Sequence, residues 1–188
     1  LKPLGVIDIG SNSVRLVVYE GAVRAPTPLF NEKVLCGLGR SVATTGRLGD
    51  ESVARALAAL RRFRAIARVL DVKHLNVVAT AAVRDAVDGA DFIDRAEAAC
   101  GYPIQVLSGE REAELAAQGI LMGFGGEVDG VAGDLGGGSL ELIDMAGPRL
   151  RRAATLPLGG LRLVDVTGNR IDEARALADE QIARLDWL

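Results

Sequence analysis

The sequence has few cysteines, no excess of positive charge and no long apolar run, and each shortage excludes a class of protein. Two cysteines in 188 residues form no disulfide framework, so we expect a reducing, cytoplasmic setting. No apolar run approaches the length of a membrane span, so we expect no membrane partner. A net charge of -3 leaves no basic footprint for DNA or RNA. A protein of this composition that handles a polyanion must do so locally, with backbone amides, a few arginines and a metal ion.

The chain has a single histidine, His74, which stands just before the apolar segment 75–79. No cysteine or second histidine accompanies it at metal-ligand spacing. We interpret His74 as a strand-edge residue, which argues against a phosphatase that uses a histidine nucleophile.

The most informative stretch runs from 133 to 144, where an apolar run ends at Asp134 and three glycines precede Ser139 and a strand carrying Glu141. Glycine has no Cβ, so backbone N–H groups in such a turn can approach an anion such as a phosphate chain. Asp134 and Glu141 are hard oxygen ligands of the kind that hold Mg²⁺ beside phosphates. A triple glycine alone is equally compatible with an ordinary β-hairpin turn.

The same pattern occurs earlier, in the segment 6–18. An overlay of the two segments pairs four residues of each: Asp8 with Asp134, Gly10 with Gly136, Ser13 with Ser139, and Arg15 with Glu141. Each copy reads as a strand, a tight Asp-x-Gly-x-x-Ser turn and a second strand. Two such hairpins facing one another would grip phosphates from both sides. Their positions, each at the start of one half of the chain, indicate two related lobes.

The order of elements predicts a mixed α/β architecture. We expect strands over 4–9, 14–20, 29–36, 75–79, 104–107 and 150–158, and a second hairpin beginning at 131. We expect helices over 51–70, 90–99, 108–122 and 161–166, and a last helix running from 171 to the end of the chain. In the third strand, Leu29, Val34 and Leu35 are expected to face the core. The lobes are then residues 1–122, which are complete, and residues 123–188, which have too few helices to cover a sheet and are expected to be truncated.

Residue patterns leave the roles of two further groups open: Arg84, and three glutamates at the start of a helix. Arg84 follows a strand, where an open α/β sheet places ligand-binding groups. Its guanidinium could reach a phosphate, or it could pair with Asp85 or Asp88. Three glutamates begin the helix at 108: Glu110, Glu112 and Glu114. Acidic residues suit the first turn of any helix, and the pattern does not choose among the three.

Five segments together resemble the exopolyphosphatase/guanosine pentaphosphatase (Ppx/GppA) family, within the actin-like ATPase superfamily. They occur in the family's order: Asp-Ile-Gly-Ser-Asn-Ser at 8–13, Thr-Ala-Ala-Val-Arg-Asp at 80–85, Leu-Ser-Gly-Glu-Arg-Glu-Ala at 107–113, Asp-Leu-Gly-Gly-Gly-Ser-Leu-Glu at 134–141, and Leu-Pro-Leu-Gly-Gly at 156–160. The first and fourth are shared with actin, heat-shock chaperones and sugar kinases. The third and fifth distinguish this family from those relatives.

The resemblance implies an actin-like (ribonuclease H-like) two-lobed α/β fold with the first lobe complete and the second partial. It implies Mg²⁺-dependent, or other divalent-cation-dependent, release of terminal phosphate from inorganic polyphosphate or from guanosine pentaphosphate (pppGpp), a nucleotide of the stringent response. It also implies a homodimer in the full-length protein. The family's catalytic core continues beyond position 188, so we expect this chain alone to be inactive or strongly impaired.

The resemblance also assigns roles to residues. Glu112 and Glu141 fall on catalytic glutamates, and Asp134, Glu141 and Asp8 on the metal side of the site. The phosphate-cradling positions are Ser11, Asn12, Ser13, Arg84, Gly136, Gly137, Gly138 and Ser139. Leu140 departs from the threonine that many members carry, but it leaves Glu141 in place.

Two other functions remain open from the sequence. One is an actin-like nucleotide-binding module that works by conformational change, for which affinity for ATP rather than polyphosphate would be diagnostic. The other is a remnant that binds polyphosphate or pppGpp and cleaves neither.

Overall fold

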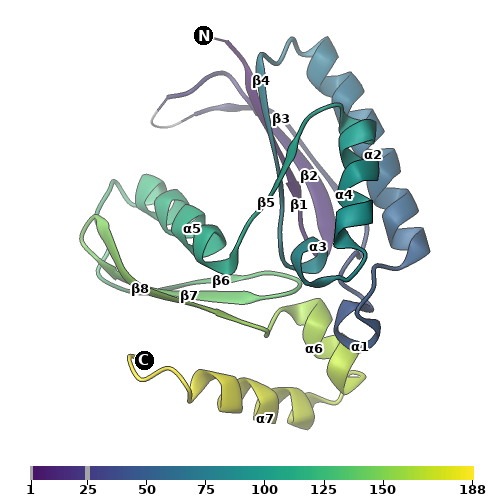
Figure 1. Cartoon of the computed structure of the whole chain (residues 1–188). Helices are drawn as coiled ribbons and strands as arrows, with labels where there is room; N and C mark the ends of the chain where they lie inside the picture. The colour runs from purple at the N-terminus through teal and green to yellow at the C-terminus, as the bar shows by residue number, and fades with distance from the viewer. Residues whose placement is uncertain (1, 24–25) are drawn as a thin grey trace.

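The computed structural model describes residues 2–23 and 26–188, so residue 1 of the expected first lobe and residues 24–25 lie outside the described residues. The described strands form two sheets (Figure 1). The five-stranded sheet has the order β3-β2-β1-β4-β5, from Leu4–Ile9 (β1), Ser13–Tyr19 (β2), Pro28–Leu35 (β3), His74–Ala79 (β4) and Ile104–Val106 (β5). The three-stranded sheet has the order β6-β7-β8, from Gly130–Leu135 (β6), Leu140–Ala146 (β7) and Arg149–Leu156 (β8).

The first sheet is mixed, as the sequence predicts. β1, β2 and β3 are antiparallel neighbours, while β4 and β5 run parallel to β1. Helices α2 (Asp50–Val69), α3 (Ala81–Asp85) and α4 (Gly89–Cys100) connect the parallel strands. In Figure 1, α2 and α4 lie side by side over one face of this sheet, and they contact each other. The sheet therefore has one covered face, and its other face is available to line a site.

The core of this unit lies between the sheet and α2. The helix has apolar residues at three-and-four spacing, and five of the six expected core positions are buried: Val53, Leu57, Leu60, Phe63 and Ala67. The sixth, Leu70, is partly buried and packs against the same core. They pack in one cluster with strand residues such as Ile7 and Leu16. Complete burial of one such Leu, Ile or Phe side chain contributes about 1.5–3 kcal/mol, so this cluster holds β1 and β2 firmly in place.

The second sheet has a much smaller core. Helix α5 (Gly109–Gly123) packs on β7 and β8, and the buried cluster consists of Ala113, Ala117, Ile143 and Met145. α5 precedes the boundary expected at 122/123, yet it covers the second sheet. The division of the chain at that boundary stays a prediction.

The last helices reach back to the first unit. Helix α6 (Gly160–Thr167) contacts the short helix α1 (Val42–Thr45), and α7 (Ile171–Ile182) follows it. The prediction that the last helix continues to the end of the chain is wrong, because α7 ends at Ile182. Beyond it, Leu185 N donates to Ile182 O. This i to i−3 bond is typical of a turn, whereas an α-helix has i to i−4 bonds. None of the helices in the described part of the chain is both long enough and apolar enough to cross a membrane.

The prediction for the core face of β3 is wrong at two of three positions. Leu29 and Leu35 are 55% and 65% exposed. Phe30 and Val34 pack against the core, because alternate side chains of a strand point to opposite faces. His74 is exposed at the first position of β4, as expected for a strand-edge residue.

Candidate functional site

The two predicted hairpins form, and they share one geometry. Corresponding residues pair in the same register: Asp8 opposite Arg15 in the first hairpin, and Asp134 opposite Glu141 in the second. The turns are closed by corresponding backbone hydrogen bonds: Gly10 N to Ser13 O at 3.0 Å, and Gly136 N to Ser139 O at 2.9 Å. The overlay of the two sequence segments therefore corresponds to an equivalence of backbone structure.

The two turns lie against each other, as expected for two hairpins that face one another. A Cβ added to Gly138 would stand 2.6 Å from the Ser11 hydroxyl, and one on Gly137 would stand 3.1 Å from the backbone nitrogen of Asn12. Ser11 is 4% exposed. Side chains at 137 and 138 would push the hairpins apart, so glycine is needed here for close approach rather than only for the turn.

The carbonyl groups of the second turn are tied to α6. Gly136 O accepts from Gly160 N at 3.1 Å, and Gly137 O accepts from Leu161 N at 2.9 Å. In a planar trans peptide the C=O and the following N–H point in opposite directions. The N–H groups of Gly137 and Gly138 therefore face away from α6.

The first turn is tied in the same manner to the loop 36–39. Ser11 O accepts from Gly39 N at 2.8 Å, and Asn12 O accepts from Cys36 N and Gly37 N at 3.0 and 2.9 Å. The N–H groups of Asn12 and Ser13 therefore face away from that loop. Each turn thus presents two successive N–H groups, the arrangement that forms an anion-binding concavity.

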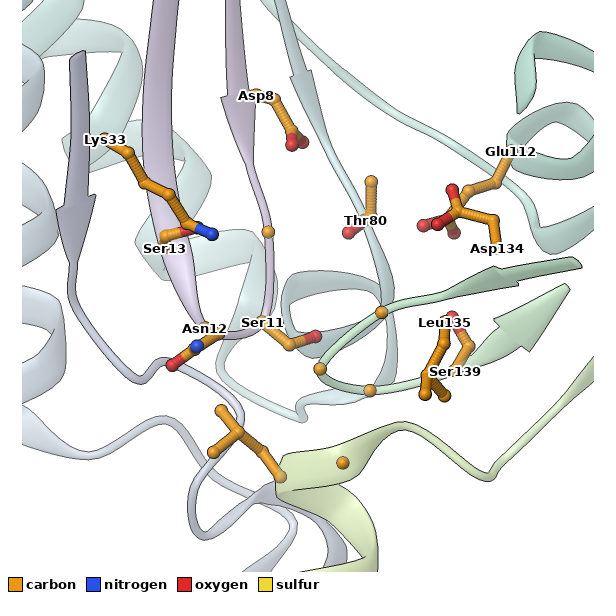
Figure 2. Close-up of a pocket in the computed structure, with 16 residues that line it drawn as sticks. Asp8, Ser11, Asn12, Ser13, Lys33, Thr80, Glu112, Asp134, Leu135 and Ser139 are labelled. Atoms are coloured by element: carbon orange, nitrogen blue, oxygen red, sulfur yellow. The ribbon is translucent and has the colours of Figure 1, made fainter. Parts of the chain in front are cut away.

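A cavity of about 500 Å³ opens between the hairpins (Figure 2). Residues of both turns line it, from 10 to 13 and from 134 to 139, together with the side chains of Asp8, Lys33, Thr80 and Glu112. Figure 2 shows Glu112 and Asp134 on one side of the cavity, with Lys33 on the opposite side. The amide donors of the turns therefore share this cavity with the carboxylates of Asp8, Glu112 and Asp134.

Glu112 is the one glutamate of its helix turn that lines this cavity among the described residues. Ser108 caps α5 by accepting a hydrogen bond from Arg111 N at 3.2 Å, which fixes where the helix starts. Glu114 instead pairs with Arg111 at 2.7 Å, and Glu110 is exposed. The Glu112 side chain is 18% exposed, and burial raises the pKa of its carboxyl although the Arg84 guanidinium opposes the rise.

Glu141 is almost fully buried beneath the second turn, with 1% of its surface exposed. Burial raises the pKa of its carboxyl to about 7, and the charges of Glu112 and Asp134 add to the rise while the Ser139 side chain opposes it. Its Oε1 atom has no hydrogen-bond partner among the described residues. An unpaired buried carboxylate oxygen is costly, and a cation is a partner that would relieve it.

Asp8 feels the same crowding of negative charge from the other hairpin. Its pKa is raised to about 6, first by lost hydration and then by the charges of Glu112 and Asp134, with Arg15 and Lys33 opposing the rise. Asp8 lines the cavity and remains exposed to solvent, so its hydration is reduced and not removed. These carboxylates destabilise one another as long as no cation lies among them.

The donor set suits Mg²⁺. In residues 2–23 and 26–188, no three His, Cys, Asp or Glu side chains gather closely enough to form a metal cage by themselves. Mg²⁺ is commonly held by one or two carboxylates, by water and by substrate phosphates, in contrast to an all-protein cage. The unpaired Glu141 Oε1 and the raised pKa of Asp8 both fit such a cation.

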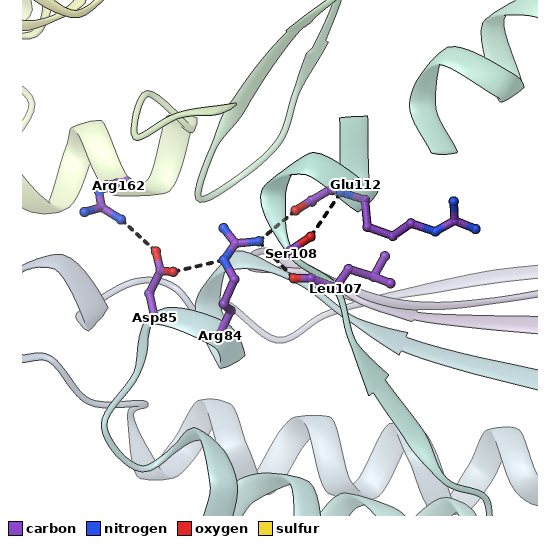
Figure 3. Close-up of polar contacts among 7 residues, drawn as sticks. Arg84, Asp85, Leu107, Ser108, Glu112 and Arg162 are labelled. Carbon is purple, nitrogen blue, oxygen red and sulfur yellow. Dashed lines mark hydrogen bonds and ion pairs between the residues drawn. The ribbon is translucent and has the colours of Figure 1, made fainter. Parts of the chain in front are cut away.

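Arg84 does not line the 500 Å³ cavity. Figure 3 shows its polar contacts instead. Its Nε donates to Asp85 Oδ1 at 3.2 Å, and its Nη1 donates to Glu112 Oε2 at 3.1 Å and to Leu107 O at 3.2 Å. It lines a smaller cavity of about 170 Å³ that also reaches Ser139. The pair with Asp85, one of the two sequence alternatives, is therefore present, and contact with phosphate stays a prediction.

Sequence reasoning missed two cavity residues with polar side chains, Lys33 and Thr80. Lys33 pairs in register with Arg15, which in turn pairs with Asp8, so the three form a row across β3, β2 and β1. Lys33 shares its face of β3 with Leu29 and Leu35, which the sequence analysis wrongly turned toward the core. Correct assignment of that face would have indicated Lys33.

Comparison with known proteins identifies relatives. A model of the Ppx/GppA phosphatase family matches residues 16–184. A crystal structure of an exopolyphosphatase from Cytophaga hutchinsonii is 30% identical with a TM-score of 0.84, and the match covers 96% of this chain and 61% of that one. A Ppx/GppA family member from Aquifex aeolicus is 24% identical with a TM-score of 0.77, over 97% of this chain and 62% of that one.

A more distant likeness concerns the fold alone. The ethanolamine utilization protein EutJ from Carboxydothermus hydrogenoformans is 19% identical with a TM-score of 0.53, over 94% of this chain and 61% of that one. Together these likenesses confirm the expected actin-like two-lobed α/β fold. The chain spans about three fifths of the length of these structures.

The seating of α6 on the glycine turn predicts unequal effects at two neighbouring glycines. A Cβ on Gly159 would stand 2.3 Å from the backbone carbon of Gly138, whereas one on Gly160 meets nothing within 4 Å. We expect Gly159→Ala to lower the free energy of unfolding by about 1–3 kcal/mol, because backbone cannot move aside as a side chain can. Gly160→Ala, the control, should change it by less than about 0.5 kcal/mol. Equal urea midpoints for the two variants would contradict this contact.

The raised pKa of Glu141 predicts a dependence of stability on pH. Between about 4.5 and about 7 the folded chain binds more protons at Glu141 than the unfolded chain does, so stability should fall as pH rises and level off above pH 7. Glu141→Gln removes the ionisable group, so the variant should gain stability relative to the parent at pH 8 and lose that gain at pH 5. Urea unfolding at both pH values measures it. Glu110→Gln is the control, and parallel curves for parent and Glu141→Gln would contradict the assignment.

Proposed function

Because the chain belongs to the Ppx/GppA phosphatase family, we propose that it takes part in a phosphoanhydride hydrolase that releases the terminal phosphate of inorganic polyphosphate. The observation that carries the proposal is a half-buried carboxylate, Glu112, facing two amide-bearing turns across one cavity. The likeness to an exopolyphosphatase of 30% identity supports polyphosphate as the substrate class. The chain spans about three fifths of that relative, so the activity is proposed for the protein to which these residues belong.

The two turns bind the terminal phosphate. Backbone N–H groups at 12–13 and 137–138 point away from the segments that hold their carbonyls, and the hydroxyls of Ser11, Ser13 and Ser139 stand beside them. Hydrolysis of a phosphoanhydride requires little covalent chemistry from the protein, so positioning and charge stabilisation supply most of the rate. Donors already fixed by the fold need no reorganisation when charge develops on the phosphoryl oxygens.

Glu112 orients the attacking water and accepts its proton. A general base works best when its pKa lies near the working pH, and burial moves Glu112 in that direction. Arg84 limits the rise and holds one carboxylate oxygen at 3.1 Å, which leaves the other oxygen for water. Thr80 lines the same cavity, and the Thr80 side chain also lowers the pKa of Glu112.

Asp134 and Glu141, with Asp8 across the cavity, would hold Mg²⁺ or another divalent cation. The bound cation supplies charge neutralisation for the phosphate oxygens and for the carboxylates that otherwise repel one another. Glu141 contributes its unpaired Oε1 from beneath the turn, and Asp134 contributes from the cavity wall. Lys33 adds positive charge on the far wall.

The base assignment predicts a graded set of variants. Glu112→Gln is nearly isosteric and cannot accept a proton, so kcat for polyphosphate hydrolysis should fall by roughly 10²–10⁴-fold with little change in binding. Glu110→Gln and Glu114→Gln, on the same helix turn but outside the cavity, should stay within about twofold. Phosphate release from polyphosphate and from pppGpp, with ATP binding measured alongside, tests both activity and substrate class. Near-parental turnover in Glu112→Gln would place the base elsewhere, with Glu141 the next candidate.

The metal assignment predicts a stabilising effect that needs no turnover. At pH 8, Mg²⁺ should raise the melting temperature, because the cation binds the folded chain and relieves repulsion among its carboxylates. Asp134→Asn should lose most of this rise, while Asp94→Asn, at an exposed position of α4, should keep it. Excess chelator should abolish hydrolysis. An undiminished rise in Asp134→Asn would exclude Asp134 as a ligand.

A further inference from the structure

A line of polar contacts joins α6 to Glu112 (Figure 3). Arg162 Nη1 donates to Asp85 Oδ2 at 3.0 Å, and Asp85 Oδ1 accepts from Arg84 Nε at 3.2 Å. Arg84 Nη1 then donates to Glu112 Oε2 at 3.1 Å. The line crosses from the unit of the second sheet to α3 of the first unit, and from there to the start of α5.

One end of this line is fixed to the glycine turn. The backbone N–H of Arg162 donates to Gly137 O at 3.1 Å, and the neighbouring N–H of Leu161 donates to the same oxygen. The same residue therefore touches the proposed phosphate-binding turn through its backbone and Asp85 through its side chain. Any shift of the turn relative to α3 changes the Arg162–Asp85 distance.

At the other end, Arg84 is shared among its acceptors. Its planar guanidinium presents donors in a rigid fork, so a rotation that follows one partner breaks the bond to another. Its side chain is 24% exposed and that of Glu112 is 18% exposed, so solvent competes only in part for these bonds. Leu107 O fixes the same Nη1 atom from the segment that leads into α5.

We infer that Asp85 and Arg162 are positioning residues for the proposed hydrolysis: they orient Arg84, and through it Glu112, when α6 is seated on the glycine turn. This inference rests on the proposed function of the same site. It links the phosphate-binding turn to the base without any contact between Arg162 and substrate. In the absence of Arg162, Asp85 has Arg84 as its remaining ion-pair partner among the described residues, and the guanidinium is drawn away from Glu112.

A second contact between α6 and the first unit supplies a matched control. Asp165 accepts from the Thr44 hydroxyl at 2.8 Å and from the Thr44 backbone N–H at 3.1 Å. This contact also docks α6 onto the first unit, but it touches neither Asp85 nor Arg84. A variant of Asp165 therefore tests docking alone.

The kinetic experiment compares Arg162→Ala, Asp85→Asn, Arg162→Lys and Asp165→Asn in polyphosphate hydrolysis by the full-length protein. The first two should lower kcat by about ten- to a hundredfold with KM within about twofold, because misorientation of a base affects the reacting state more than binding. Arg162→Lys keeps a cation beside Asp85 and should recover most of kcat. Asp165→Asn should stay within about twofold of the parent. In a Glu112→Gln background, Arg162→Ala should cause no further loss.

Two kinetic outcomes would overturn the inference. An Arg162→Ala effect of the same size in the Glu112→Gln background would mean that Arg162 acts elsewhere. An equal loss in Asp165→Asn would mean that only the docking of α6 matters.

The final arm does not depend on turnover and separates this inference from the proposed function. The Arg84 Nε–H signal in ¹H–¹⁵N spectra, assigned by its absence in Arg84→Lys, should move in Arg162→Ala and in Asp85→Asn but not in Asp165→Asn. If the full-length parent protein hydrolyses neither polyphosphate nor pppGpp, the proposed function fails, and this signal still decides whether Arg162 controls Arg84. An unmoved Arg84 signal in Arg162→Ala overturns the inference whatever the activity.

Discussion

The site depends on how the carbonyl groups of two turns are held. Segment 36–39 bonds the carbonyls of the first turn, and the first turn of α6 bonds those of the second. Peptide planarity then directs the following N–H groups away from both segments, so each turn is a preorganised set of donors. The turns can lie this close only because residues 137 and 138 lack side chains. For the same reason, α6 can reach the carbonyls of the second turn only because Gly159 has no side chain. Four separate segments, 10–13, 36–39, 136–139 and 159–162, thus produce one arrangement of donors.

Like-charge crowding is the cost of that arrangement. The carboxylates of Asp8 and Glu141 have raised pKa values because lost hydration and the charges of Glu112 and Asp134 disfavour ionisation. A protein selected only for stability would replace the unpaired Glu141, since a buried acid without a partner weakens the fold. Perturbed carboxylates gathered beside a cavity are the arrangement expected of a site that binds a cation or moves a proton.

The sequence predicted the elements that follow from local patterns. The repeated Asp-x-Gly-x-x-Ser turn gave two hairpins of equal register, and the spacing of Leu57, Leu60 and Phe63 gave α2 with its buried face. It failed where a tertiary contact decides. The face of β3 depends on which side of the sheet α2 covers, so Leu29 and Leu35 were misassigned and Lys33 was overlooked. The end of α7 at Ile182 was missed for a related reason, since none of its residues is buried and no packed face marks its length. The partners of Arg84 come from segments 23 and 28 residues away, which no local pattern connects.

The two halves of the site differ in how firmly they are built, and this difference gives the contacts between them their importance. The first hairpin rests on a large core of buried strand and helix residues, whereas the second rests on a cluster centred on Ala113, Ala117, Ile143 and Met145. Two alanines bury little apolar area, so the second hairpin has less free energy available to hold its position. The polar contacts of α6, at Asp85 and at Thr44, are among the contacts that fix one turn opposite the other. Partly exposed ion pairs are individually weak, so under the proposed function a phosphate chain that contacts both turns at once would shift the distance between them.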